Sequence, residues 1–474
     1  MRINTLVLLI IPAAVYAQEK SDLEQILERM DRLEQQNREL AAEVRALRSE
    51  LSDSFGARAP GSPLDAGNSP VAAPAVSAQT AAPSNAEASS APTVPPLEER
   101  VAVQEQRAAD LAQSKVQASQ RLPVTLTGML LFNGFMNSQG AGGAQDPLVA
   151  SPFSNASNDG ASLSQSIIGL TFQGPRILGG GQVSGDLHMD FWGGTSSSLN
   201  HLVRLRVATI RVDWKNQSVI IGQDKPIVSP RDPTSLAQVA FSPLTSSGNL
   251  WLWQPQVRFE QRFTLGDDAG VRADVGVYET SEPTASAGTE YLSTLSTVRP
   301  AAQGRFMFWK NFDHGVRVEI APGFHVSETH VAGVSVPSRL FTIDWLIQPM
   351  PKIQLTGMFF NGENTAGLGG LRQGFTIFYD GTVRTVGAAG GWLQLSYFAT
   401  RRLTFNVYGG QESNRPEDLL GGEIARNFSY AANATYQLGP NVLLGWETGQ
   451  VRTTYLGSMQ RLANHYDLAL AYLF

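Results

Sequence analysis

The stretch that decides the fold closes the chain: residues 466–474 read YDLALAYLF. Successive side chains of a strand point to opposite faces. One face therefore holds only apolar and aromatic residues: Tyr466, Leu468, Leu470, Tyr472 and Phe474. His465 and Asp467 lie on the other face, so the pattern predicts a lipid-facing barrel strand rather than the last strand of a soluble sandwich. An aromatic carboxyl terminus also resembles the signal by which bacterial outer-membrane barrels are recognised for insertion.

The amino terminus has the pattern of an export signal. Met1 and Arg2 precede an apolar run over residues 6–15, and Val15-Tyr16-Ala17 offers a cleavage point before Gln18. We therefore expect residues 1–17 to be a removable signal peptide, too short for a membrane span. No other stretch of the sequence approaches the ~18 apolar residues of a spanning helix. An exported chain of this kind enters a membrane only as a closed barrel.

The composition agrees with a barrel and excludes some functions. The chain has 45 glycines and no cysteine, and its mean hydropathy is -0.12. The absence of cysteine excludes disulfides and thiol chemistry. A net charge of -6 argues against nucleic acid as a partner.

Residues 18–51 have a heptad pattern, which predicts a short α-helical coiled coil. Its two seam positions are filled by Leu23, Met30, Asn37, Val44 and Leu51, and by Ile26, Leu33, Leu40 and Leu47. The polar Asn37 either fixes the register of parallel helices or is simply tolerated in a weak coil. The coil predicts a homo-oligomer, and the mixed seam leaves dimer and trimer open.

The chain between the coil and the strands divides into two further parts. Residues 52–96 are rich in Ala, Pro and Ser, which predicts a flexible linker because little apolar surface can be buried. Residues 97–122 have apolar positions at helical spacing, which predicts a second short helix ended by Pro123.

From residue 123 to 474 the sequence predicts about sixteen antiparallel strands. Alternating segments are joined by tight turns, such as Lys215-Asn216 and Gly439-Pro440, and by long loops over residues 140–161, 226–250, 279–298 and 361–385. Short turns at one rim and long loops at the other are typical of an outer-membrane barrel. At this strand number the interior is an aqueous channel. The fold class is thus an all-β transmembrane barrel with an N-terminal periplasmic coiled-coil extension.

Three short motifs resemble the DcaP-like trimeric outer-membrane porins. They are Leu126-Thr127-Gly128-Met129, Gly222-Gln223-Asp224 and Asp232-Pro233-Thr234-Ser235. The order of coiled coil, spacer and barrel is also similar. The resemblance implies a homotrimer in the outer membrane with a periplasmic extension, and a channel that favours small organic anions such as dicarboxylates.

Strand alternation places many arginines on the predicted lumen face. Arginine stays charged and offers carboxylates a planar fork, and cationic side chains along a pore favour anions. Together with the loop residues below, the predicted pore-lining set is Arg204, Arg206, Lys225, Arg231, Asp232, Arg258, Glu260, Arg262, Arg272, Arg305 and Arg317. Arg211 and Asp213 fall out of phase with Arg204 and Arg206, which predicts a bulge or a strand end between them.

The same faces carry acids, so the arginines could instead pair locally. Residues 124–474 contain 26 Asp and Glu against 24 Arg and Lys. Net charge therefore does not support anion selectivity, and a general diffusion channel stays open as an alternative.

In sixteen-strand porins the loop after the fifth strand folds inward and narrows the channel, and the similarity implies the same for the long loop 226–250. It carries Arg231 and Asp232, whose opposed charges would order polar solutes; alternatively, Asp232-Pro233 simply starts a turn. Trp251 and Trp253 are expected to belong to the interfacial aromatic girdle rather than to a sugar slide.

The sequence predicts no enzyme, catalytic residue, metal or cofactor. Asp186, His188 and Asp190 alternate on one strand, but residues two apart lie ~6.5 Å from each other, too far to hold one ion without other strands. The expected partners are outer-membrane lipid, further copies of the chain and small anionic or polar solutes. A second hypothesis is a structural barrel that anchors the periplasmic coil to peptidoglycan.

Overall fold

A computed structural model describes residues 124–474, except 154–155, 194–200, 282–293 and 296–297. All of these residues belong to one compact unit, Pro95–Phe474. The predicted signal peptide, coiled coil, linker and short helix lie outside the described residues.

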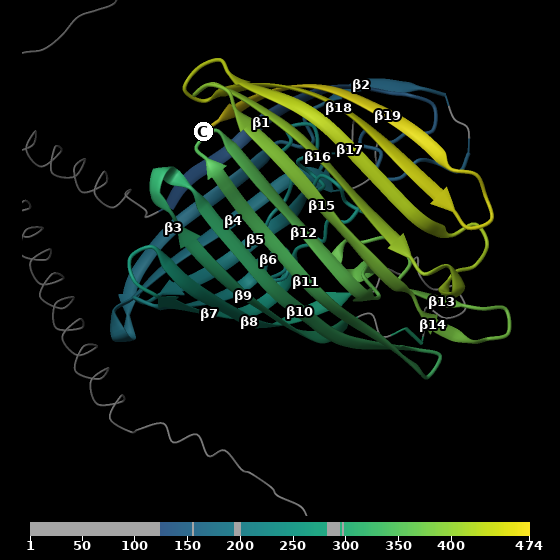
Figure 1. Cartoon of the computed structure of the whole chain (residues 1–474), viewed down its shortest axis with the longest axis horizontal. Coiled ribbons are helices and arrows are strands. Elements are labelled where there is room, and N and C mark those ends of the chain that lie inside the picture. The colour runs from purple at the N-terminus through teal and green to yellow at the C-terminus, as the bar shows by residue number, and fades with distance from the viewer. Residues whose placement is uncertain (1–123, 154–155, 194–200, 282–293, 296–297) are drawn as a thin grey trace, which may run out of the picture. The chain divides into compact units, whose positions relative to one another are not determined.

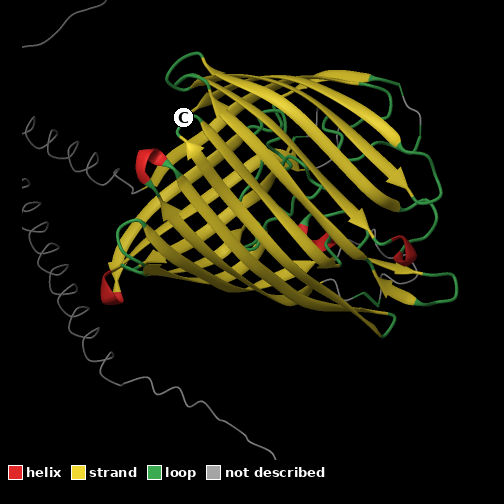
Figure 2. Ribbon diagram, viewed as in Figure 1, coloured by secondary structure: helices red, strands yellow, loops and turns green. Residues whose placement is uncertain are grey.

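The described residues form one large antiparallel sheet and a two-stranded hairpin (Figures 1 and 2). The strands of the large sheet are β1 (Val124–Asn137), β2 (Asn158–Ser162), β3 (Ile167–Ile177), β4 (Gly181–Gly193), β5 (Leu202–Asp213), β6 (Gln217–Asp224), β7 (Gln254–Thr264), β8 (Ala269–Ser281), β9 (Val298–Asn311), β10 (Arg317–Val331), β11 (Val334–Met350), β12 (Ile353–Glu363), β15 (Gly387–Phe398), β16 (Leu403–Asn414), β17 (Ile424–Gln437), β18 (Val442–Tyr455) and β19 (Arg461–Leu473). The hairpin is β13 (Phe375–Ile377) and β14 (Val383–Thr385), and short 3-10 turns are η1 (Leu178–Gly180), η4 (Asp313–Gly315), η5 (Ala366–Leu368) and η6 (Pro416–Asp418).

The large sheet closes into a barrel because its first and last strands pair. Met129 of β1 lies opposite Leu473 of β19. β2 and β3 both pair with β1, over successive parts of its length, so they form one interrupted strand of the wall. Counting them together reduces the 17-stranded sheet to the sixteen barrel strands that the sequence predicted.

The wall has an apolar outside and a polar inside. On β19, Leu468 is 54% exposed while Asp467 is 3% exposed, and on β10 Phe324 is 41% exposed while His325 is fully buried. Apolar residues on the exposed face are typical of a barrel in lipid. The predicted outward face of residues 466–474 is confirmed, because Tyr466, Leu468, Leu470, Tyr472 and Phe474 are all exposed. Within the described residues, no helix has the length and apolarity to cross a membrane.

The predicted turns and loops alternate between the two rims, with two exceptions, of which one is the short connection 456–460 between β18 and β19. Lys215-Asn216 joins β5 to β6, and Gly439-Pro440 joins β17 to β18. The connection between β10 and β11 lies at the long-loop rim but consists only of Ala332 and Gly333. Both residues have positive φ, the backbone of a two-residue hairpin turn. The rule of long loops at this rim therefore fails there.

The predicted bulge lies in β5 at Arg206. His188 of β4 pairs with Val207 and the next residue, Met189, pairs with Leu205, which leaves Arg206 without a partner in the ladder. The extra residue lets Arg204 and Arg206 both reach Asp190, while Arg211 bonds Asp213.

Candidate functional site: the barrel lumen

The long loop after β6 folds into the barrel, as predicted, and we call residues 225–253 the crossing loop. At its start Arg231 contacts Glu319 of β10 and donates to Asp344 of β11 at 2.6 Å. A few residues later the Ser235 hydroxyl donates to Glu447 of β18 at 2.6 Å. The loop therefore touches two different parts of the wall within five residues.

The middle of the crossing loop is fixed by side chains of the wall. Gln394 of β15 accepts the backbone N–H of Thr234 at 2.6 Å. Asn133 of β1 donates to the Leu236 carbonyl at 2.9 Å. Gln165, at the interruption between β2 and β3, accepts the N–H groups of Val239 and Ala240. These bonds satisfy loop backbone groups that the barrel interior would otherwise leave without partners.

Two arginines of β5 join the crossing loop to the wall near its far end. The Arg204 guanidinium lies 2.6 Å from the Asp190 carboxylate and donates to the Ala240 carbonyl at 2.6 Å. Arg206 lies 3.5 Å from the same carboxylate. The fully buried Asp190 thus partners two cations, which leaves this corner with excess positive charge.

Trp251 and Trp253 belong to this corner, so the prediction of an interfacial girdle is wrong. β7 begins only at Gln254, and the backbone N–H of the buried Trp251 donates to the Leu368 carbonyl at 3.0 Å. An edge-to-face aromatic chain runs through Trp192, Phe241, Trp251 and Trp253. Arg204 and Arg206 lie over the Trp253 ring, 5.2 and 4.8 Å from its centroid.

The other predicted cations lie on the inner face of β7 to β10, each beside a carboxylate. The pairs are Arg258 with Asp224 (3.3 Å), Arg262 with Glu260 (2.5 Å), Arg272 with Asp274 (3.1 Å), Arg305 with Asp344 (2.7 Å) and Arg317 with Glu319 (2.5 Å). In the crossing loop, Lys225 pairs with Asp232. Every cation of the predicted set therefore has an acidic partner within 4 Å.

The cations of this wall differ in how far they reach solvent. The side chain of Arg305 is 1% exposed, whereas those of Arg272 and Arg317 are 33% and 46% exposed. Arg211, which the predicted set left out, is 32% exposed and lies 3.6 Å from Glu260. The sequence analysis missed Arg211 because the bulge at Arg206 shifts the phase of the strand, and only that shift turns the Arg211 side chain inward.

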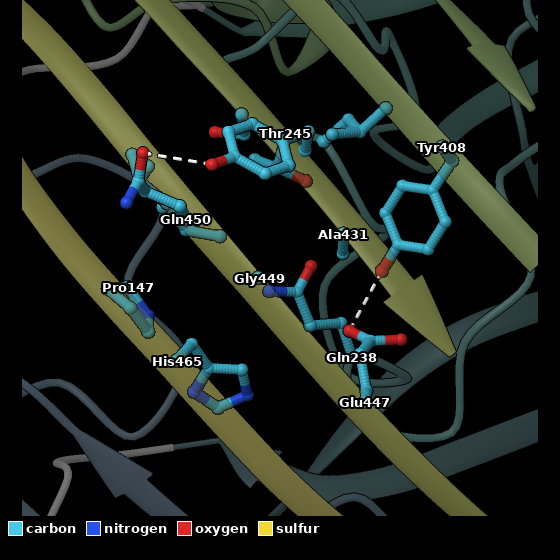
Figure 3. Close-up of a pocket in the computed structure, with 14 residues that line it drawn as sticks. Pro147, Gln238, Thr245, Tyr408, Ala431, Glu447, Gly449, Gln450 and His465 are labelled. Carbon is cyan, nitrogen blue, oxygen red and sulfur yellow. Dashed lines mark hydrogen bonds between the residues drawn. The ribbon is translucent and has the colours of Figure 1, made fainter. Parts of the chain in front are cut away.

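The facing half of the barrel has a different charge. Among the described residues of β15–β19, the inward-facing acids are Glu412, Glu447 and Asp467, and the one inward-facing cation is Arg461, exposed at the rim end of β19. Glu447 accepts hydrogen bonds from Tyr408 at 2.8 Å and from Asn433 at 2.9 Å. Figure 3 shows Tyr408, Glu447 and His465 around a small cavity on this acidic wall. Sequence alternation assigned Asp467 and His465 to the polar face but gave no sign of this grouping.

Loop residues of the lumen have shifted pKa values. Burial, together with the neighbouring Arg206, lowers the pKa of Lys225 to about 8. Burial also raises the pKa of Asp146, in the loop between β1 and β2, well above its usual value, and Asp467 and Glu447 add to the effect.

Among the described residues, no three His, Cys, Asp or Glu side chains are arranged to hold a metal ion. Asp190, one member of the alternating Asp186-His188-Asp190 triplet, is engaged by Arg204 and Arg206.

The barrel is similar to solved structures of membrane channels. The outer membrane channel DcaP of Acinetobacter baumannii has 16% sequence identity to this chain and a TM-score of 0.62, with 74% of this chain and 97% of that chain covered. The anion-selective porin from Comamonas acidovorans has 13% identity and a TM-score of 0.50, with 74% and 99% covered. No family model matches the sequence, and no curated protein matches it. At these identities the likeness establishes a porin-type barrel fold.

Proposed function

We propose that the protein is an outer-membrane porin, a water-filled channel for passive diffusion of small hydrophilic solutes. We further propose that it favours small organic anions such as dicarboxylates. The observation that carries the proposal is the crossing loop, which spans the lumen between an arginine-rich wall and an acidic wall. The named functions of the neighbours, an outer membrane channel and an anion-selective porin, support it.

The separation of charge gives a physical basis for selection. Arg262, Arg272 and Arg317 are the partly exposed cations of one wall, and carboxylates of a solute make passing contacts with such guanidinium groups. The buried inward-facing acids of the facing wall add a field across the lumen, which orients dipolar solutes. Cations along a pore lower the electrostatic barrier to anions.

The pairing of the wall arginines favours a second candidate function, a general diffusion porin. Each predicted cation already has a carboxylate within 4 Å, which reduces the charge that a passing solute meets. Anion preference then depends on the small local excess of cations, such as the two arginines that share Asp190.

We also propose a homotrimer with its N-terminal extension in the periplasm. The heptad pattern of residues 18–51 supports oligomerisation. The apolar outer face of the barrel supports contact with lipid. The alternative is an envelope-structural protein, in which the extension reaches towards peptidoglycan and the barrel is mainly an anchor; a plugged barrel would support it.

The test is the reversal potential of the purified protein in a planar bilayer under a salt gradient. We expect a preference for chloride that falls towards zero in the double variant Arg258→Ala, Arg262→Ala. The matched control is Arg339→Ala, since Arg339 lies on the outward face and its side chain is 65% exposed. Conductance without preference would leave the general diffusion porin, and a folded barrel without conductance would leave the structural anchor.

A further inference from the structure

The loop between β1 and β2 is called L1 here, and the structure describes its residues 138–153 and 156–157. Ala150 of L1 is hydrogen-bonded to Thr453 and Tyr455 of β18, and L1 also meets the acidic wall through one buried pair of titratable groups. Asp146 Oδ1 of L1 lies 4.0 Å from Nε2 of His465 on β19, and the two side chains are 1% and 4% exposed. Within the described part of the chain, neither carboxylate oxygen of Asp146 has a hydrogen-bond partner, and neither does His465 Nε2.

The hydrogen bonds around His465 assign its tautomer. The Asn137 amide nitrogen donates to the carbonyls of Ala144 and Gln145, both at 2.9 Å. Its Oδ1 is therefore an acceptor, and it lies 2.6 Å from His465 Nδ1. We assign the hydrogen to Nδ1, so Nε2 of a neutral imidazole presents a lone pair.

A lone pair and a carboxylate then face each other in a buried site. Two buried acceptors without donors are costly, most of all when one of them is charged. The titratable groups near Asp146 are acidic or neutral and none is cationic. They are Asp467 on β19, Glu447 on β18 and Tyr408 on β16. No ion pair between a Lys or Arg and either Asp146, Asp467 or Glu447 occurs among the described residues.

We propose that Asp146 and His465 hold one proton between them, and that this proton latches L1 to β19. With the proton present, an O–H of Asp146 donates to Nε2, or the proton sits on Nε2 and donates to the carboxylate. Either form draws the two atoms from 4.0 Å to a hydrogen-bond distance of about 3 Å and leaves the pair with no net charge. Loss of the proton as the pH rises leaves one negative charge beside Asp467 and Glu447, and the pair separates.

The latch affects the crossing loop because L1 packs beside residues 244–246 of that loop. Pro147 and Leu148 of L1, together with Leu244 and Thr245 of the crossing loop, line the cavity of about 30 Å³ in Figure 3. Asn427 of β17 donates to the carbonyls of both Leu148 and Ser246, at 2.8 and 2.9 Å. Movement of L1 away from β19 would therefore remove part of the packing around residues 244–246 of the crossing loop.

The sign of the pH effect follows from the burial of Asp146. Its pKa is raised in the folded protein, so the folded state binds the proton more tightly than the unfolded state does. The latch is therefore present below the raised pKa of Asp146 and is lost as the pH rises through it.

The experiment measures the mobility of L1 directly and does not require the barrel to conduct. The chain has no cysteine, so Gln139→Cys, at an exposed L1 position, accepts a single spin label. Label mobility is recorded against pH in the otherwise unchanged full chain, and again with Asp146→Asn added. The asparagine amide donates to Nε2 at every pH, so this variant keeps the latch closed. Asp267→Asn, at an exposed turn between β7 and β8, is the matched control.

We expect a pH-dependent increase in label mobility in the parent and in the Asp267→Asn control, and loss of that step in Asp146→Asn. His465→Gln provides a second variant if Asp146→Asn does not fold, because its amide donates to the ionised Asp146 carboxylate and accepts from the protonated form, so the pair stays joined in both states. Mobility that does not change with pH in the parent overturns the proposal. The same pH-dependent step in Asp146→Asn or in His465→Gln also overturns it.

Discussion

The Arg231 guanidinium, in the crossing loop, lies 2.6 Å from the Asp344 carboxylate of β11. Arg231 also contacts Glu319 of β10. The side chain of Glu319 is 5% exposed and that of Asp344 is 2% exposed. The same Asp344 is held by Arg305 from β9 at 2.7 Å. Arg231, expected from the sequence to line the pore, therefore acts as a strut that fixes the crossing loop to the wall.

Replacing Arg231 by alanine should loosen the crossing loop. The change leaves a buried Glu319 with Arg317 alone and Asp344 with Arg305 alone, and removing one partner of a buried pair costs about 3–5 kcal/mol. We expect a lower free energy of unfolding and noisier, larger single-channel conductance. Denaturant unfolding and bilayer recording measure the two effects. Arg231→Lys, which keeps one charge, should fall between, and unchanged conductance in Arg231→Ala would contradict the strut.

Replacing Trp253 by alanine should destabilise the cationic corner. Its ring lies beneath both Arg204 and Arg206, and a cation over an aromatic ring contributes about 0.5–2 kcal/mol. We expect a lower thermal midpoint by circular dichroism, with Trp253→Phe affected less. Trp446→Ala is the control, because Trp446 is exposed on the outer face. Equal effects of the two alanine variants would argue against the stacking.

The charge of Lys225 should make anion preference depend on pH. Its pKa is lowered to about 8, so it loses its positive charge as the pH rises through that value. The reversal potential should therefore move towards zero on the alkaline side. Lys225→Arg, which stays charged, should abolish the shift. A parent protein whose reversal potential is constant through this range would rule Lys225 out as a selective charge.

Gly128→Ala should impair closure of the barrel. A Cβ at this position would lie 2.5 Å from the Ile167 carbonyl oxygen and 2.6 Å from the Phe474 ring. Gly128 and Phe474 also exchange backbone hydrogen bonds at the seam, so strain there acts on the pairing of β1 with β19. We expect a lower yield of folded barrel on refolding into detergent. Gly439→Ala, which has open space around it, should refold normally.

The alternation of side chains let the sequence predict most of the wall. It placed Arg258, Glu260 and Arg262 of β7 on the lumen face, and these residues alternate with the exposed Val257, Phe259 and Phe263. Trp251 and Trp253 were misplaced because they precede the start of β7 at Gln254, where alternation no longer fixes the direction of a side chain. Within a strand the direction of a side chain is a local property, and outside a strand it is not.

The sequence by itself determined the class of fold and the number of barrel strands, because a period of two and turn residues are local signals. The inward fold of the crossing loop was expected only by analogy with sixteen-strand porins. Only the tertiary structure decided which groups meet. Arg231 is separated from Glu319 and Asp344 by 88 and 113 residues, and Asp146 meets His465 from the opposite end of the barrel sequence. Partners of this kind depend on closure of the sheet and on the path of loops across the lumen. That is why the sequence predicted cations in the lumen, while the structure decided which of them are struts, which are partly exposed and where a buried pair can share a proton.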